Sequence, residues 1–249
     1  MSEINLANYF MVFCSLDKVK GMNIKMKKKE KVIIENEIKF EVPQKKDFIQ
    51  IYKYLNNNYE IIPYKNALLY DYYYDTLSKE LLHKNMSYRI RFRPQPSINL
   101  KLPHSKLNNI WSRYEYSCKI DEKLSESELL DYDCTINMIM QQVLEKQNLR
   151  ECLSIVGKLN TYRIGFNICD KQRNILGQRQ LIGVAFFDKT VNLKNLNEFY
   201  EFEMESYEQT DVYACPYIFE RFKNIGDFLL KKGFLPSKNS KYYRCLSEK

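Results

Sequence analysis

The most regular pattern of hydrophobic and polar positions lies over residues 33–41. Apolar and charged residues alternate there with a period of two, which predicts a β-strand with two different faces. One face carries Glu35, Glu37 and Lys39, and the other is apolar apart from Asn36. An edge strand with a solvated charged face is the simplest interpretation, but similar charged faces recur along the chain.

Related signals predict the other elements. Alternation and a content of β-branched or aromatic residues predict strands over residues 68–76, 87–93, 98–102, 110–120, 154–158, 162–169, 181–188 and 199–206. Helical spacing of apolar residues predicts helices over residues 43–55, 125–150 and 217–232. Because many of the strands follow one another through short loops, the order favours antiparallel meander pairing.

Several predicted strands carry their charge on one face. These faces hold Arg89, Arg91 and Arg93, then Lys101, Arg113 with Glu115, Lys158, and finally Glu201, Glu203 and Glu205. Carboxylates that share an enclosed face repel one another unless cations bind there. A closed sheet with charge inside and helices over an apolar outer surface accounts for both faces. Such an interior suits a polyphosphate with a divalent metal, because carboxylates bind hard cations and Arg or Lys binds phosphate oxygens.

Composition argues against several other kinds of site. The 249 residues include only seven glycines, and neither G-x-G-x-x-G nor G-x-x-x-x-G-K occurs, so no glycine-rich phosphate loop is expected. The presence of only two histidines argues against a histidine-based metal site and against a Ser-His-Asp triad. Seven cysteines without C-x-x-C spacing indicate free thiols in a reducing compartment. A formal charge of +8 indicates an anionic partner without identifying it.

The N-terminal region looks like an appendage to a single domain. We expect residues 1–30 to form a flexible basic extension and residues 31–249 to form the domain. The lysine-rich run at residues 25–31 is either a solvated tail or an arm that binds a polyanion. No stretch approaches the ~20 apolar residues that span a bilayer, and no signal peptide is recognisable. We therefore expect a cytoplasmic protein without a membrane contact.

Seven short motifs, in this order, resemble the CYTH family, also called the triphosphate tunnel metalloenzymes. They are Glu35-Asn36-Glu37-Ile38-Lys39 (E-x-E-x-K), Tyr73-Tyr74-Asp75-Thr76 (Y-Y-D-T), Tyr88-Arg89-Ile90-Arg91 (L-R-I-R), Asn99-Leu100-Lys101 (T-x-K), Arg113-Tyr114-Glu115 (R-x-E), Asp188 with Phe199 to Glu205 (D…L-G-x-F-x-E-x-E) and Ser240-Lys241-Tyr242 (S-K-Y). The resemblance spans about residues 32–243. It departs from the family pattern at Asn99, at Ser117 and after Lys158, where no arginine follows.

The resemblance implies an α+β fold in which about eight antiparallel strands close into a barrel, or tunnel, with helices packed outside. It implies that carboxylates hold Mg²⁺ or Mn²⁺, and the predicted metal ligands are Glu35, Glu37, Glu115, Asp188, Glu203 and Glu205. The implied phosphate-binding residues are Lys39, Arg89, Arg91, Lys101, Arg113, Lys158 and Lys241. In the strand over residues 199–206, Asn197 falls where the family has glycine, so the alignment to the family motif has two registers. One register matches the two motif glutamates to Glu201 and Glu203, and the other matches them to Glu203 and Glu205.

The leading hypothesis is a metal-dependent triphosphatase that hydrolyses tripolyphosphate or an organic triphosphate, such as thiamine triphosphate or a nucleotide. Glu205 or Glu201 is predicted to orient the attacking water, and Lys39 is counted with the catalytic residues. The alternatives are a class IV-type adenylyl cyclase that makes cyclic AMP and pyrophosphate, an RNA 5′-triphosphatase, and a non-catalytic polyphosphate-binding module. The expected partner is a small-molecule triphosphate. An RNA 5′ end has little support, and no obligate protein partner is evident.

Overall fold

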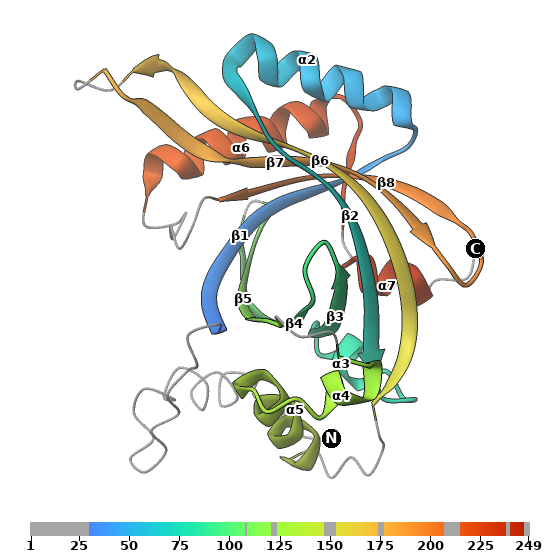
Figure 1. The fold of residues 1–249 in the computed structure, drawn as a ribbon. Helices are drawn as coiled ribbons and strands as arrows, with labels where there is room; N and C mark the ends of the chain where they lie inside the picture. The colour runs from blue at the N-terminus through green and yellow to red at the C-terminus, as the bar shows by residue number, and fades with distance from the viewer. Residues whose placement is uncertain are drawn as a thin grey trace, which may run out of the picture.

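The computed structural model describes residues 30–107, 109–120, 124–146, 153–173, 177–206, 215–237 and 240–246 (Figure 1). The strands are β1 (Glu30–Val42), β2 (Tyr59–Asp75), β3 (Ser87–Arg93), β4 (Ser97–Leu107), β5 (Ile110–Lys119), β6 (Ser154–Arg173), β7 (Arg179–Asn192), β8 (Glu198–Ser206) and β9 (Leu235–Pro236). The helices are η1 (Lys45–Asp47), α2 (Phe48–Asn58), α3 (Glu80–His83), α4 (Glu126–Leu130), α5 (Thr135–Lys146), α6 (Pro216–Lys231) and α7 (Lys241–Leu246). The predicted extension, residues 1–30, lies outside the described residues except for Glu30.

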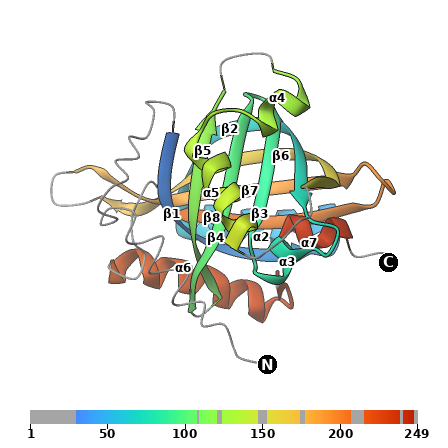
Figure 2. The ribbon, with the colours of Figure 1, turned by 90° about the horizontal axis from the view of Figure 1, so that it is seen from below.

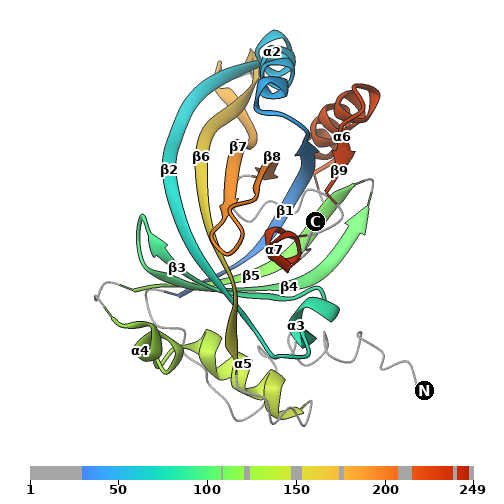
Figure 3. The same cartoon turned by 90° about the vertical axis from the view of Figure 1, so that its right-hand side faces the viewer.

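The strands of this described part form one sheet in the order β5-β4-β3-β2-β6-β7-β8-β1-β9, and a further pairing of β1 with β5 closes it. β1 achieves closure because its first part pairs with β5 and its last part pairs with β8, both antiparallel. Eight strands therefore form the barrel, and β9 is added beside β1 (Figure 3). The predicted closed antiparallel barrel of about eight strands with helices outside is confirmed.

One outer face of the barrel is covered by α2 and α6 (Figures 1 and 3). Phe40 of β1 and Phe202 of β8 are fully buried there and belong to one apolar cluster with Leu55 of α2 and Phe222 of α6. Since successive side chains of a strand point to opposite faces, packing Phe40 and Phe202 outward turns their charged neighbours inward. The helix packing thus decides which face of β1 and β8 lines the barrel interior.

A second outer face, formed by β3, β4 and β5, is covered by α4 and α5 (Figure 2). Ile90, Leu100 and Tyr116 of these strands pack with Ile136 and Met140 of α5. Their sequence neighbours on each strand are polar or charged and face the opposite way. No helix in the described part of the chain is long and apolar enough to cross a membrane.

Several predicted helices and strands differ from the structure in their extent. The helix predicted over residues 125–150 is two helices, because the side-chain amide of Asn137 donates hydrogen bonds to the carbonyl oxygens of Leu129, Leu130 and Tyr132 at 2.8–3.1 Å. Those bonds stabilise a break after α4. The strands predicted over residues 154–158 and 162–169 are one continuous strand, β6, which pairs with both β2 and β7.

Candidate functional site

The inward side chains line a cavity inside the barrel, which we call the tunnel. Strands β1 to β6 and β8 contribute to it, and α7 contributes from one end of the barrel (Figure 3). The charged lining residues are Glu35, Glu37, Lys39, Asp71, Arg89, Arg91, Lys101, Arg113, Glu115, Arg163, Glu203, Glu205 and Lys241. Charged side chains almost never lie this deep unless they are paired or bind a ligand, so their arrangement indicates what the tunnel accepts.

Three carboxylates from β1 and β8 form the first acidic group. Glu37 lies directly opposite Glu205 in the β1–β8 ladder, and one oxygen each of Glu35, Glu37 and Glu205 lie within 4.8 Å of one another. Lys101 Nζ lies 2.5 Å from Glu35 Oε2, and Arg113 bonds to Glu37. The negative charge of Glu205 is less well balanced than that of Glu35 or Glu37, because Arg163 Nη1 lies 3.8 Å from Glu205 Oε1.

The chemistry of this first group fits a hard divalent cation. Burial, together with the negative charge of Glu35, raises the pKa of Glu205 to about 8. A raised carboxyl pKa means that the site favours an added positive charge, either a proton or a metal ion. Mg²⁺ and Mn²⁺ prefer such oxygen ligands, so the residues present fit the predicted metal.

The second acidic group, Asp188 of β7 with Glu201 and Glu203 of β8, is surrounded by cations. Lys241 Nζ lies 2.8 Å from Asp188 Oδ2 and 2.9 Å from Glu201 Oε1, and it also bonds to Glu203. Arg163 bonds to both Asp188 and Glu203. Burial would raise the pKa of Glu203, but Lys241, Lys39 and Arg163 outweigh it and hold that pKa well below its usual range. Glu203 therefore already has its countercharge, whereas burial raises the pKa of Glu201 even beside Lys241 and Lys39.

The opposite wall is mainly basic. Arg91 holds Asp71 through two parallel bonds, from Nε at 2.7 Å and from Nη2 at 2.8 Å, and Arg89 Nη1 lies 3.4 Å from the same carboxylate. The two arginines lower the pKa of Asp71 against the effect of its burial. Glu115 has a lowered pKa for a similar reason, since Lys101 and Arg89 outweigh its burial. The wall thus presents guanidinium and ammonium groups in fixed positions, the donors that bind phosphate oxygens.

The structure brings nearly all the predicted site residues together. Asp188 and Glu201 do not line the cavity, but they are fully buried in direct contact with Lys241, which does. Lys158 lies elsewhere. It is paired with Tyr72 in the β2–β6 ladder, and its Nζ is 4.3 Å from the centre of the Tyr72 ring on the outer face. Because Asp71 faces inward, strand alternation turns the neighbouring Tyr72–Lys158 pair outward.

Three charged residues of the site were missed in the sequence. Arg163 lines the tunnel, Asp71 holds Arg91, and Arg244 of α7 lies 3.1 Å from Glu201. Arg163 is the only basic residue in the predicted strand 162–169, and Asp71 is an acid between tyrosines in the strand 68–76. Each is a charge inside an otherwise apolar or aromatic strand, and that signal could have identified both.

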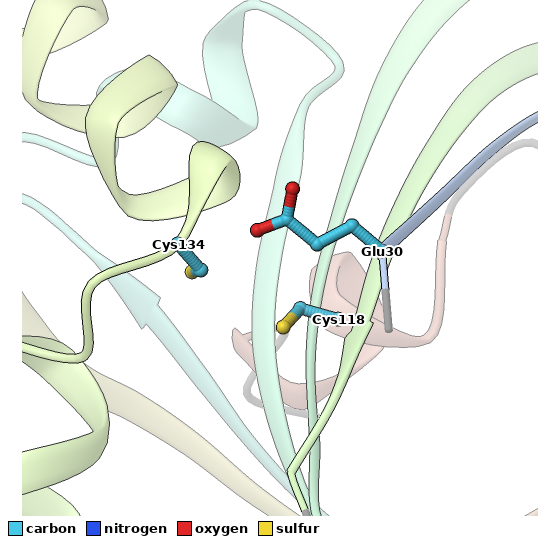
Figure 4. A group of neighbouring side chains, drawn as sticks. All are labelled: Glu30, Cys118 and Cys134. Carbon is cyan, nitrogen blue, oxygen red and sulfur yellow. The ribbon is translucent and has the colours of Figure 1, made fainter. Parts of the chain in front are cut away.

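A third group of candidate metal ligands lies outside the barrel, where Glu30, Cys118 and Cys134 face one another (Figure 4). Glu30 has a structural role there. Its carboxylate accepts hydrogen bonds from Thr135 N at 2.8 Å and from Thr135 Oγ1 at 2.5 Å, so it caps the N-terminus of α5. Cys118 and Cys134 are buried thiols that form no disulfide, and they lie in the apolar cluster beneath that helix.

Comparisons with known proteins agree with this fold. The model of the CYTH domain family matches residues 34–214. The fold resembles a putative adenylate cyclase from Bacillus halodurans, with a TM-score of 0.55 and 20% identity, over 87% of this chain and 99% of that chain. It also resembles a putative adenylyl cyclase from Hippeastrum that reveals a dominant triphosphatase activity. That match has a TM-score of 0.51 and 19% identity, and it covers 84% of this chain and 93% of that chain. None of the curated proteins matches the chain by sequence.

Proposed function

The chain belongs to the CYTH domain family, and from that premise we propose that it is an enzyme that hydrolyses a triphosphate in its tunnel with a divalent cation. One observation supports this more than any other. A single cavity contains three clustered carboxylates, Glu35, Glu37 and Glu205, the last of which has Arg163 as far as 3.8 Å away, together with a wall of arginines and lysines. A metal-bound triphosphate has the complementary arrangement of charge, since its cation matches the carboxylates and its oxygens match the wall.

We assign the metal to Glu35, Glu37 and Glu205 and propose Mg²⁺ or Mn²⁺. The cation would polarise the phosphoryl oxygens and lower the pKa of a bound water. Glu203 and Asp188, which the sequence also placed at the metal, instead hold Lys39, Lys241 and Arg163 in position. Glu115 has the same role for Lys101 and Arg89, at 3.8 and 3.9 Å.

The basic residues of the tunnel would bind the phosphate oxygens. They are Lys39, Arg89, Arg91, Lys101, Arg113, Arg163 and Lys241, so Arg163 takes the place that the sequence gave to Lys158. These groups stabilise the charge that develops on the leaving diphosphate as the bond to the terminal phosphorus lengthens. Glu205 lines the cavity, and we propose that it orients the attacking water. Glu201 is fully buried under Lys241 and Arg244 and does not line the cavity.

The same site could serve a different acceptor. In an adenylyl cyclase the 3′-hydroxyl of ATP replaces water, and pyrophosphate leaves instead of orthophosphate. The Hippeastrum protein of the same fold has a dominant triphosphatase activity, which makes hydrolysis the first reaction to test.

The test is to measure the products from tripolyphosphate, ATP and thiamine triphosphate with Mg²⁺, with Mn²⁺ and with a chelator. We expect metal-dependent release of orthophosphate. Cyclic AMP with pyrophosphate from ATP would favour the cyclase. Binding of tripolyphosphate without any turnover would leave a polyphosphate-binding module.

A matched pair of lysine variants tests the site itself. Lys101→Gln removes a cation of the tunnel and should lower kcat/KM by roughly 100-fold, as loss of one preorganised donor does. Lys158→Gln removes a lysine of the outer face and should leave kcat/KM within about twofold, since surface substitutions away from a site have small effects. Equal losses in the two variants would contradict the assignment of the wall.

A further inference from the structure

A second cavity lies beside the tunnel, and we call it the vestibule. The two cavities are adjacent, since they share the lining residues Glu37, Lys39, Ser87, Arg113 and Ser240. The vestibule lies between α3, the β4–β5 hairpin and α7, which are close together at one end of the barrel (Figure 3). A ligand whose phosphates occupy the tunnel can therefore extend into the vestibule.

The vestibule differs from the tunnel in its chemistry. Away from the shared residues, its lining includes Leu82, Met86, Pro103, Trp111 and Tyr243. Ligand sites usually combine such apolar and aromatic surface with a few charged groups that fix orientation. Inorganic tripolyphosphate has nothing to place against these side chains, whereas an organic triphosphate has.

Trp111 occupies a defined position relative to the phosphate wall. It lies opposite Glu37 in the β1–β5 ladder, and Arg113 lies opposite Glu35, so Trp111 and Arg113 share the inward face of β5. Two residues along a strand span about 7 Å. The indole therefore lies one sugar-sized step beyond the last arginine of the wall, on the side toward the vestibule.

The charged side chains beside Trp111 limit which organic groups the vestibule can bind. Lys106 Nζ is 4.1 Å from the centre of the Trp111 ring, and Arg113 lies on the tunnel side. Two nearby cations repel a positively charged organic group, such as the thiazolium ring of thiamine. They are compatible with a neutral, flat heteroaromatic ring, which stacks on an aromatic side chain for about 1–3 kcal/mol per base.

We propose that the vestibule binds the base of a nucleoside triphosphate, with Trp111 as the stacking surface and Tyr243 on the α7 side. This inference rests on the proposed function, because it assumes that the triphosphate lies in the tunnel. It makes Trp111 a residue that determines specificity and leaves the reaction on the phosphates to the tunnel.

The first experiment reports on binding alone. Trp111 is the only tryptophan of the chain, so tryptophan fluorescence reports on the vestibule directly. With metal chelated to prevent turnover, ATP should quench the fluorescence in a saturable way, and tripolyphosphate and thiamine triphosphate should not. Quenching by tripolyphosphate as strong as that by ATP, or no quenching by ATP, would overturn the proposal.

The second experiment uses turnover. Trp111→Ala should lower kcat/KM for ATP by about 5- to 150-fold, the fold-change that corresponds to the stacking energy, and should leave kcat/KM for tripolyphosphate within about twofold. Trp111→Phe should retain most of the ATP activity. Tyr162→Ala removes an exposed aromatic side chain of β6 and serves as the control, with no effect on either substrate.

The two experiments separate the possible failures. Equal losses for ATP and tripolyphosphate in Trp111→Ala would show a structural role for the indole and overturn the proposal. Absence of hydrolysis of any triphosphate by the wild-type protein would remove the proposed function, and the fluorescence titration would still decide whether a base binds. If Trp111→Ala does not fold, the fluorescence titration of the wild-type protein decides the proposal.

Discussion

Glu203 and Glu205 are two residues apart on β8, line the same tunnel and have opposite electrostatic surroundings. Glu203 Oε1 lies 2.8 Å from Lys39 Nζ, and Lys241 and Arg163 also bond to this carboxylate. Glu205 lies in the acidic group with Glu35 and Glu37. Removing the charge should therefore stabilise the fold at one position and destabilise it at the other.

We predict that Glu205→Gln keeps or raises the free energy of unfolding, because burial and Glu35 raise the pKa of this carboxyl to about 8 and folding at neutral pH must therefore protonate it, whereas a glutamine is already neutral. Glu203→Gln should lower it by about 3 kcal/mol, because three buried cations, Lys39, Arg163 and Lys241, each lose one of their carboxylate partners. For a chain of this size that is a fall in Tm of roughly 5–10 °C. Thermal unfolding at neutral pH in chelator measures both.

Both variants should lose hydrolytic activity, so activity alone does not distinguish them. Glu198→Gln, an exposed position of the same strand, is the control and should change neither Tm nor activity. A Tm for Glu205→Gln as low as that for Glu203→Gln would contradict the electrostatic difference between the two carboxylates.

For single residues, the sequence predicts well which strands carry charged side chains. It predicts less well which of those side chains point into the barrel. The alternation around Glu35 and Glu37 is long enough to define a face. On β6, residues 158–163 pair with β2 without a register shift, so Lys158 and Arg163, five residues apart, lie on opposite faces. Lys158 was assigned to the wall although it faces outward, and Arg163, which faces inward, was overlooked.

Two short helices near the tunnel depend on one carboxylate at the end of β2. Asp75 is fully buried and accepts hydrogen bonds from Leu81 N at 2.9 Å and Leu82 N at 3.0 Å, which fixes the start of α3. The hydroxyl of Tyr242 in α7 donates to the same carboxylate. Because Lys241 precedes Tyr242, this bond also positions the ammonium group that reaches Asp188 and Glu201.

We predict that Tyr242→Phe loosens α7 without changing its packing. The variant keeps the stacking on Tyr73, whose ring centre is 5.5 Å away at an interplanar angle of 6°. It loses one buried hydrogen bond to a charged group, so the free energy of unfolding should fall by about 2 kcal/mol. Amide hydrogen exchange of α7 should become faster.

Tyr162→Phe is the matched control, since this tyrosine is 53% exposed on the outer face of β6. It should leave both the free energy of unfolding and the exchange rates unchanged. Unchanged exchange in α7 for Tyr242→Phe would mean that other contacts hold this helix.

The elements that the sequence predicted less well are those in which local pattern competes with tertiary contacts. β2 begins at Tyr59, nine residues before the predicted strand, and it contains Pro63 beside a register shift in its pairing with β6. Proline within a strand usually argues against a strand, and only the long neighbouring β6 explains why one forms. Asn137 likewise ends α4 through contacts that span seven or eight residues.

Over the whole molecule, the tunnel is already neutralised by its own ion pairs. Each of its cations lies within 3.4 Å of a carboxylate among the described residues. Those pairs join residues from distant parts of the chain, such as Glu35 with Lys101 and Lys241 with Asp188. The sequence could indicate that opposite charges share an interior, but barrel closure decides which charges meet.

This pairing predicts that metal and triphosphate assist each other's binding. A triphosphate competes with Glu35 for Lys101 and with Glu37 for Arg113, whereas a cation bound to these carboxylates releases the basic groups for phosphate. The coupling should be about 10-fold or more in affinity and equal in both directions. Calorimetric titration of tripolyphosphate with and without Mg²⁺, corrected for the metal bound by tripolyphosphate in solution, measures it.

Glu35→Gln distinguishes this coupling from simple attraction of a polyanion to a basic tunnel. In the wild type, the carboxylate of Glu35 lies 2.5 Å from Lys101 Nζ and 3.6 Å from Arg113 Nη2. The variant takes away the nearest carboxylate of Lys101, leaves Arg113 on Glu37 alone, and removes a metal ligand. It should therefore bind tripolyphosphate more tightly than the wild type in chelator, yet gain little from Mg²⁺. Weaker binding by the variant in chelator would mean that Glu35 positions Lys101 for phosphate rather than competing with it.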